Sequence, residues 1–363
     1  MRRATVRRRF LLRQLSHRDL KSARGAFCGG AETAGCAQRV GEFGRRRHTA
    51  RYAMQTVRLA QSVWSAWQAM HMMRGDMAGE LIDAQVHLGR AGESDLGVTA
   101  DEMVSAMHEN SVTAALITGR TQIDRDNAYM LEAAANHPSE FGVIGVVDAA
   151  SPDLDHEMGE LKRHGSLLGL RMSVITEQDR AKWRVGAFNR LFASATRHTL
   201  PICVWLPTLR LSELVPLVKA HPDLQFVLDH LGLPQPTRIV RADNPPMRRL
   251  ADVVRLAQYP NVAIKITGAP TLSQGLYPFI DLWPALHRII SAYGLQRTMW
   301  GSDWTRVKSC TYAEGIDYIR LSNELSPGDK EWLFSRTVRR IFRWPSTDKT
   351  RGSLRESDDH ARS

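Results

Sequence analysis

The chain has 363 residues, with 49 Lys and Arg against 38 Asp and Glu, which gives a formal net charge of +11. Residues 1–75 contain 16 of the basic and 3 of the acidic residues, so the other 288 residues carry 33 basic and 35 acidic side chains, a net charge of −2. A strongly basic surface favours nucleic acids or anionic membranes. The body of the chain lacks that charge, so from residue 77 onward we exclude a basic nucleic-acid-binding fold, and we expect no nucleic acid and no membrane as partner.

The first 76 residues form an Arg-rich leader without sustained helical or strand periodicity. A packed domain needs a periodic apolar face, so we expect the leader to be disordered and dispensable, or to precede a true start near Met77. Residues 77–345 are enough for one barrel domain, and residues 346–363 are predicted to be a polar tail. The four cysteines form no CxxC pair, so we expect neither a disulfide framework nor a cysteine zinc site, and we expect a cytoplasmic location.

From Leu81 onward, short apolar runs alternate with amphipathic stretches, a pattern typical of βα units. The predicted strands are residues 81–87, 113–118, 142–147, 167–172, 201–206, 225–230, 262–267 and 298–302. The predicted helices are residues 100–109, 127–136, 153–164, 187–198, 211–220, 246–258, 280–293, 312–323 and 328–342. Eight strands, each followed by a helix, predict an α/β protein with a single-domain (β/α)8 TIM barrel. A doubly wound sheet needs a glycine-rich phosphate turn after its first strand, and Leu-Gly-Arg-Ala-Gly-Glu lacks that spacing.

Polar residues that end an apolar barrel strand are the candidates for chemistry, because the catalytic groups of such barrels stand at the carboxyl ends of the strands. In the first strand, a side-chain period of two places Asp83, Gln85 and His87 on one face. The aliphatic residues between them must then pack on the helices. We therefore expect Gln85 and His87 to point into the barrel.

The sixth and eighth strands end on similar residues. Asp229 and His230 follow an apolar run, and Asp303 follows Gly301, which lets the backbone approach a site closely. The alternative role of Asp303 is a helix N-cap. Trp304, the next residue, is a candidate for substrate binding.

Two basic residues lie within apolar strands. Arg171 closes the fourth strand, and Lys265 stands between two isoleucines in the seventh. A buried cation is costly without an anionic partner or substrate. We expect these side chains either to bind substrate or to pair with a barrel carboxylate such as Asp83 or Asp229.

Three segments together suggest a family. Leu-Ile-Asp-Ala-Gln-Val-His, Leu-Asp-His-Leu-Gly-Leu-Pro and Trp-Gly-Ser-Asp-Trp occur in this order and at barrel spacing. Over about residues 80–344 the chain resembles the amidohydrolase superfamily, in the amidohydrolase-related branch that includes sugar-lactone and pyrone-dicarboxylate lactonases and some decarboxylases. The resemblance implies a TIM barrel that carries out hydrolysis.

The resemblance also implies a possible metal site from which this chain departs. Members of the family usually carry His-x-His in the first strand, where this chain has Gln85, and a ligand in the fifth strand, where this chain has neither His nor Lys. His87, His230 and Asp303 carry over, and three such ligands can hold a zinc ion with an open position. We therefore expect either no cofactor or one weakly held divalent metal such as zinc.

These residues predict a hydrolase of a small lactone or other cyclic or carboxylic ester. Asp303 is the expected general base, and His87 and His230 orient the water or the carbonyl group. The residues expected to bind a substrate with a carboxylate or hydroxyl groups are Arg171, Lys265 and Gln85. The alternatives are a metal-dependent non-oxidative decarboxylase of the same branch and a catalytically decayed barrel that binds a small molecule. The sequence leaves the oligomeric state open, with a homo-oligomer as one option.

Overall fold

The structure is a computed structural model that describes residues 79–90, 98–120, 127–237 and 240–345. The predicted leader and the predicted polar tail lie outside the described residues. So does the predicted start of the folded domain near Met77.

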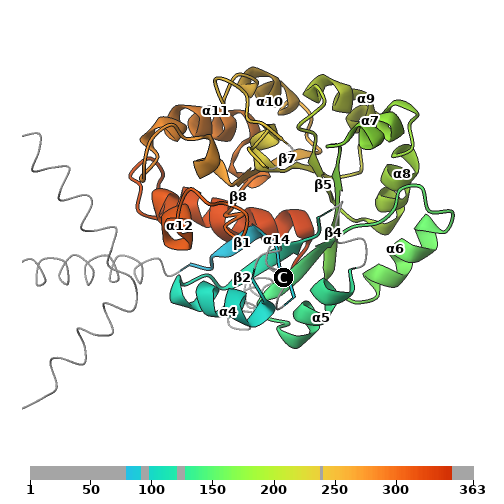
Figure 1. Ribbon diagram of the computed structural model, residues 1–363, viewed down its shortest axis with the longest axis horizontal. Coiled ribbons are helices and arrows are strands. Elements are labelled where there is room, and N and C mark those ends of the chain that lie inside the picture. The colour runs from blue at the N-terminus through green and yellow to red at the C-terminus, as the bar shows by residue number, and fades with distance from the viewer. Residues whose placement is uncertain (1–78, 91–97, 121–126, 238–239, 346–363) are drawn as a thin grey trace, which may run out of the picture. The chain divides into compact units, whose positions relative to one another are not determined.

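The described residues form one sheet of eight parallel strands in the order in which they occur along the chain. The strands are β1 (Ile82–Val86), β2 (Ala114–Thr118), β3 (Phe141–Gly145), β4 (Leu167–Ser173), β5 (Ile202–Trp205), β6 (Phe226–Leu228), β7 (Val262–Thr267) and β8 (Thr298–Gly301). At the seam between the last and the first strand, the Asp303 N–H donates to the Gln85 carbonyl at 3.0 Å. The ring of strands in Figure 1 is therefore a nearly closed barrel, and the TIM-barrel prediction and all eight predicted strands are confirmed.

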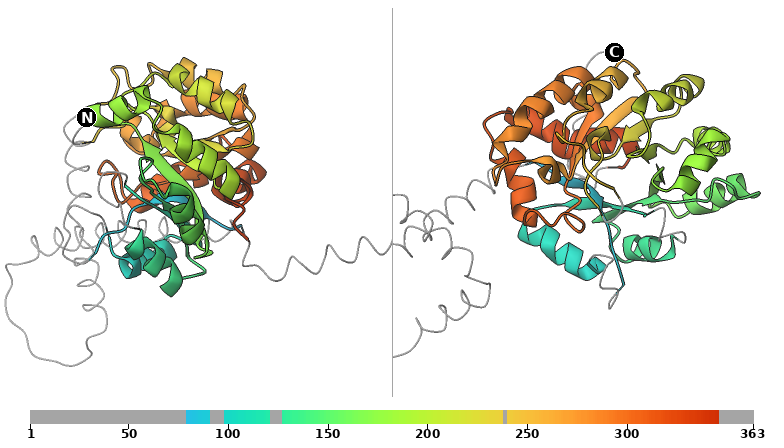
Figure 2. Two further views of the ribbon diagram at one scale, coloured as in Figure 1. Left: turned by 90° about the vertical axis from the view of Figure 1, so that its right-hand side faces the viewer. Right: turned by 45° about the horizontal axis from the view of Figure 1, so that its top comes forward.

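Helices surround the barrel (Figures 1 and 2). They are α4 (Ala100–Glu109), α5 (Ala128–Asn136), α6 (Leu154–Lys162), α7 (Glu177–Arg184), α8 (Asn189–His198), α9 (Val215–Ala220), α10 (Leu250–Leu256), α11 (Trp283–Tyr293), α12 (Tyr312–Arg320), α13 (Pro327–Glu331) and α14 (Thr337–Phe342). Short 3-10 turns are η1 (Leu211–Leu214), η2 (His230–Gly232), η3 (Ala269–Leu272), η4 (Ile280–Leu282) and η5 (Leu295–Arg297), and a π-helical turn, η6 (Trp332–Arg336), joins α13 to α14. The sequence did not predict α7, because this helix buries none of its residues and so has no apolar face to detect.

The apolar core has two layers. The larger one fills the space between the strands and the surrounding helices. The smaller one lies inside the barrel at the amino ends of the strands, where residues such as Ala114, Val227 and Met299 meet Ile341 and Phe342 of α14. Because apolar side chains close this end of the barrel, the polar side chains inside it lie beyond them, toward the carboxyl ends of the strands.

The first strand departs from simple alternation. Asp83 pairs with Ala115 but Val86 pairs with Ile117, so β1 has one residue more than β2 between these pairs. Ile82 and Ala84 lie in the interior layer and Val86 lies in the outer one, whereas alternation had predicted that all three would face the helices. The prediction was wrong for Ile82 and Ala84, because the extra residue between Asp83 and Val86 shifts the alternation within the strand.

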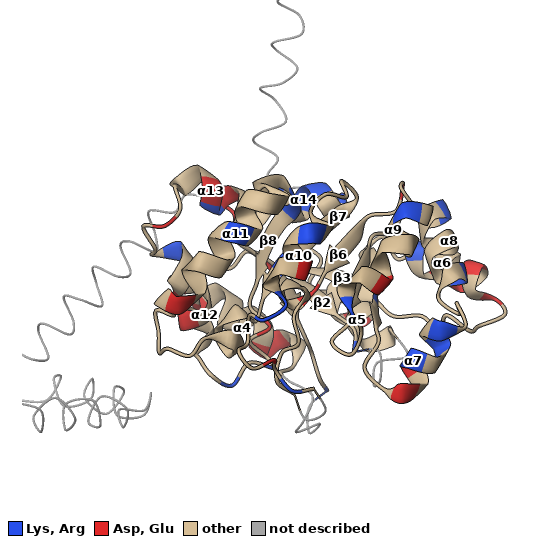
Figure 3. Ribbon diagram, turned by 90° about the horizontal axis from the view of Figure 1, so that it is seen from above, with Lys and Arg blue, Asp and Glu red and all other residues tan. Residues whose placement is uncertain are grey.

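The outer surface carries charges of both signs, as the interspersed blue and red segments on the barrel helices in Figure 3 show. Cys203 and Cys310 have free thiols. Among the helices of the described segments, none has both the length and the apolar character that a membrane span requires.

Candidate functional site

Three side chains meet where β1, β6 and β8 end. His87 directly follows β1, His230 begins η2 after β6, and Asp303 lies two residues beyond β8. His87 Nε2 is 3.2 Å from Asp303 Oδ1, and His230 Nδ1 is 3.9 Å from Asp303 Oδ2. The three residues are only 3%, 4% and 5% exposed, so the charges in this cluster are shielded from water and interact strongly.

The backbone is specialised at the same place. His230 and Asp303 have φ angles of 54° and 52°, in the left-handed region that non-glycine residues rarely occupy and that is often found at functional sites. A Cβ atom added to Gly301 would lie 3.1 Å from the backbone nitrogen of Gln85. The absence of a side chain at Gly301 therefore lets the end of β8 lie against β1.

A second group of charges lies directly beneath these residues. The Asp229 carboxylate pairs with Lys265 Nζ at 3.1 Å and with Arg171 Nε at 3.0 Å. Lys265 and Asp229 are completely buried, and Arg171 is 7% exposed. Of the two predicted partners for the basic residues, Asp229 is therefore the one found, and Lys265 lies below the mouth of the barrel rather than in it.

Asp83, the other predicted partner, points out of the barrel. Its carboxylate accepts hydrogen bonds from the Ser302 N–H at 2.8 Å, from the Ser302 hydroxyl at 2.5 Å and from the Tyr312 hydroxyl at 3.0 Å. Burial raises the pKa of Asp83 to about 6, against the lowering effect of these hydrogen bonds. Asp83 therefore anchors the turn that carries Asp303. Trp304, predicted to bind substrate, stacks on Tyr312 with ring centroids 4.9 Å apart.

The two charge groups are connected through His230 and Gln85. His230 Nε2 lies 3.3 Å from Arg171 Nη2 and 3.3 Å from Gln85 Nε2. Lys265 Nζ donates to Gln85 Oε1 at 3.4 Å. Gln85 therefore points into the barrel and contacts both the lower charges and the mouth.

Burial determines the protonation of the histidines. It lowers the pKa of His230 to about 4 and the pKa of His87 below its usual value, in both cases against the opposing effect of Asp303. Burial alone would raise the pKa of Asp303, but the hydrogen bond from His87 and the neighbouring positive charges hold it below its usual value. At neutral pH His230 is therefore uncharged, and the low pKa of Asp303 keeps a carboxylate in the site.

His87 has a defined orientation. Its Nδ1 lies 2.5 Å from the Thr118 carbonyl oxygen, and a carbonyl can only accept, so Nδ1 carries a proton. Nε2, which faces Asp303 at 3.2 Å, then presents its lone pair to a carboxylate oxygen. Two acceptors at this distance need a proton between them, so His87 and Asp303 share a proton as one coupled pair.

One site residue, Arg120, was missed by the sequence analysis. It follows β2, is 6% exposed, and its charge helps to lower the pKa of His87. Its position, two residues after the end of a predicted barrel strand, was the signal in the sequence that could have identified it. Arg120 therefore adds its positive charge to that of Arg171 beside His87.

The donor set does not fit a resident metal ion. The Nε2 lone pair of His230 faces two donors, Arg171 and Gln85. If Nδ1 bound the metal instead, the proton of a neutral His230 would lie on Nε2 and point at those donors. Of the three expected ligands, His87 and Asp303 therefore remain. Among the described residues, no group of three or more His, Cys, Asp or Glu side chains is arranged to hold a metal.

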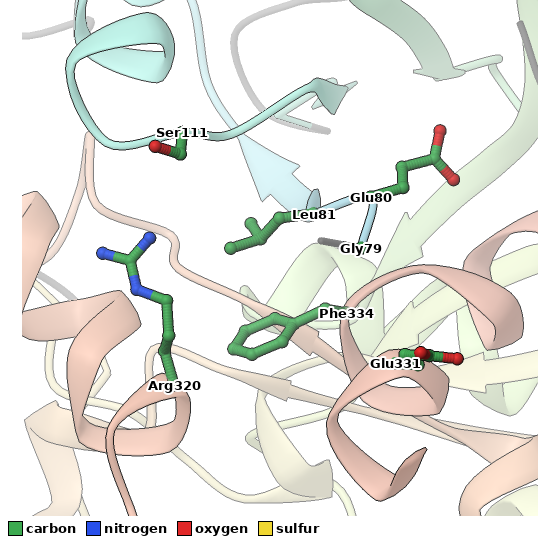
Figure 4. A pocket seen from close by; sticks show the side chains of 7 residues that line it. All are labelled: Gly79, Glu80, Leu81, Ser111, Arg320, Glu331 and Phe334. Atoms are coloured by element: carbon green, nitrogen blue, oxygen red, sulfur yellow. The ribbon is translucent and has the colours of Figure 1, made fainter. Parts of the chain in front are cut away.

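A pocket lies at the opposite end of the barrel, before the start of β1 (Figure 4). Its lining residues are Gly79, Glu80, Leu81, Ser111, Arg320, Glu331 and Phe334. It contains none of the predicted site residues.

Comparisons with known proteins agree with the fold. The chain is 26% identical over 285 residues to an L-fucono-1,5-lactonase of Burkholderia multivorans, covering 73% of this chain and 96% of that protein. It is also 26% identical over 198 residues to the uncharacterized protein y4mH of Sinorhizobium fredii, where the match covers 49% of this chain and 61%, less than two thirds, of the relative.

Several solved structures are similar. An amidohydrolase of Burkholderia multivorans with bound zinc has a TM-score of 0.63 and 23% identity, covering 73% of this chain and all of that one. A probable 2-pyrone-4,6-dicarboxylic acid hydrolase of Acinetobacter baumannii with bound citric acid has a TM-score of 0.58 and 18% identity, with the same coverage. A 5-carboxyvanillate decarboxylase of Novosphingobium aromaticivorans with bound manganese has a TM-score of 0.52 and 12% identity, covering 74% of this chain and 98% of that one. At these identities the likeness concerns the fold.

The family assignment follows from the length of the sequence match. Residues 82–344, from the first residue of β1 to beyond α14, match the family described as Amidohydrolase. The chain belongs to the amidohydrolase family.

Proposed function

We propose that this protein hydrolyses a small lactone or another cyclic or carboxylic ester, with Asp303 as the base that activates water. The observation that carries the proposal is a buried carboxylate at the barrel mouth whose Oδ2 faces His230 Nδ1 at 3.9 Å, a nitrogen that has no hydrogen-bond partner among the described residues. A water molecule there can bond to both groups. The similarity to an L-fucono-1,5-lactonase supports the lactone class.

The proposed reaction has two proton transfers. Asp303 takes a proton from water while the water oxygen bonds to the lactone carbonyl carbon. The resulting oxyanion lies among the positive charges of Arg120 and Arg171, which stabilise it more than they stabilise the neutral carbonyl. The ring C–O bond then breaks, and the ring oxygen takes the proton held by the Asp303–His87 pair, which yields a hydroxy acid.

We propose that Arg120 and Arg171 recognise a carboxylate or hydroxyl groups on the substrate, because guanidinium groups suit such acceptors. Lys265 is completely buried against Asp229. We therefore assign it to charge balance beneath the site rather than to direct substrate contact. Trp304 lies against Tyr312, and its contact with substrate remains a prediction.

A panel assay tests the function. Purified protein would be offered sugar lactones, a pyrone dicarboxylate, linear aryl esters and hydroxylated aromatic carboxylates, each with and without a chelator. We expect lactone hydrolysis that the chelator does not abolish, and its loss in Asp303→Asn. Carbon dioxide release from an aromatic acid that needs added metal would instead support the decarboxylase. Stoichiometric ligand binding without turnover of any substrate would support the decayed barrel.

A further inference from the structure

Gln85 occupies a position from which it contacts charged groups at two levels of the barrel. Its Oε1 lies 3.4 Å from Lys265 Nζ, and its Nε2 lies 3.3 Å from His230 Nε2. An ammonium group can only donate hydrogen bonds, so the amide oxygen must face Lys265. The opposite orientation would set the amide hydrogens against the ammonium hydrogens. Lys265 thereby turns the NH₂ group of Gln85 toward His230.

His230 Nε2 then meets two donors. Besides the Gln85 amide, Arg171 Nη2 lies 3.3 Å from the same nitrogen, and a guanidinium group has no acceptor. A ring nitrogen that faces two donors must offer its lone pair. A neutral His230 therefore carries its proton on Nδ1, the nitrogen that faces Asp303.

This tautomer matters for the orientation of the nucleophile. A water molecule beside Asp303 Oδ2 accepts a hydrogen bond from His230 Nδ1–H and donates its own proton to the carboxylate. One water lone pair remains for the carbonyl carbon. With the other tautomer, Nδ1 would compete with Asp303 for the water protons and turn the attacking lone pair away.

We propose that Gln85 is a positioning residue that, held by Lys265, fixes His230 as its Nδ1–H tautomer and so orients the water that Asp303 activates. The role in water orientation rests on the hydrolase function proposed above. The tautomer itself does not, since it follows from the hydrogen-bond geometry alone.

The test variant is Gln85→Glu, which keeps the shape but replaces the donor with an acceptor carboxylate. That carboxylate favours a proton on His230 Nε2. Gln258→Glu is the matched control, because Gln258 is exposed two residues after α10 and its side chain donates to the Arg255 carbonyl. Both variants change the charge by the same amount.

The tautomer is read directly from the ring ¹⁵N chemical shifts of labelled histidine, with the His230 signals assigned by their loss in His230→Asn. We expect Nδ1–H in the wild type and in Gln258→Glu, and a protonated Nε2 in Gln85→Glu. For the lactone substrate we expect kcat to fall at least about tenfold in Gln85→Glu with KM changed less than threefold, and no change in Gln258→Glu.

Other results overturn the inference. A wild-type His230 protonated at Nε2 refutes it without any variant, so the test stands even if Gln85→Glu does not fold. An unchanged tautomer, or an unchanged kcat with an altered tautomer, refutes the role of Gln85. If no lactone is hydrolysed but the wild type shows Nδ1–H, the hydrolase function fails while the tautomer assignment holds.

Discussion

The replacement Lys265→Met tests whether the buried lysine serves the fold or the substrate. Lys265 and Asp229 are 3.1 Å apart and neither is exposed to solvent. Removal of one partner of a buried ion pair costs about 3–5 kcal/mol of unfolding free energy. Because Arg171 still pairs with Asp229 at 3.0 Å, we expect the lower end of this range, about 3 kcal/mol.

A double-mutant cycle in urea measures this energy. Asp229→Asn alone leaves Lys265 without its charged partner and should also destabilise, and the double variant should lose about 2–3 kcal/mol less than the sum of the two single losses. The m-values should stay equal, so that the midpoints report stability. Lys219→Met is the control, since Lys219 is exposed on α9, and should change stability by less than about 0.5 kcal/mol. If the unfolding free energy of Lys265→Met lies within about 1 kcal/mol of the wild-type value, about a third of the expected loss, and KM rises strongly, then Lys265 binds substrate. Its assignment to charge balance beneath the site would be wrong.

Three further predictions concern charge, acid and metal. Arg120→Met should raise KM about 10- to 100-fold, the effect of losing one charge-assisted hydrogen bond to the substrate; an unchanged KM for every substrate with a carboxylate or hydroxyl group would remove Arg120 from the site. The pKa of His230 is lowered from 6.5 to about 4, so the unfolded chain takes up this proton first as pH falls, and the drop in unfolding free energy between pH 6.5 and 4 should be about 3 kcal/mol larger in the wild type than in His230→Asn; an equal drop in the two proteins would contradict this. Elemental analysis should find less than one equivalent of divalent metal, removable by chelator without loss of lactone hydrolysis, whereas one or two tightly held equivalents would refute the conclusion that the site residues do not fit a resident metal ion.

The strands could be predicted because each is a short apolar run, and the polar residues at the strand ends singled out His87, His230 and Asp303 as candidates. The bulge in β1 could not be predicted, because it is defined by the pairing of β1 with β2. Helix α7 lacks a buried face, although the capping box formed by Thr176 and Asp179 was a local signal for its start.

The hydrogen bonds and ion pairs between site residues could not be predicted from the pattern of residues along the chain. The sequence left Asp83 and Asp229 as equal partners for the basic residues, and the choice depends on which face of each strand points inward. The proton position on His230 depends on Arg171 and Gln85, which come from β4 and β1. Such contacts join residues more than 50 positions apart in the chain.

The central claim is that Asp303 activates the water that opens an ester ring. The most direct measurement is kcat of Asp303→Asn on the lactone that the wild type hydrolyses, with the fold checked by circular dichroism. The amide keeps the size of the carboxylate and cannot accept the proton, so kcat should fall about 10²- to 10⁴-fold while the spectrum is unchanged. A folded Asp303→Asn enzyme with wild-type kcat would contradict the account and leave His230 as the next candidate for the base.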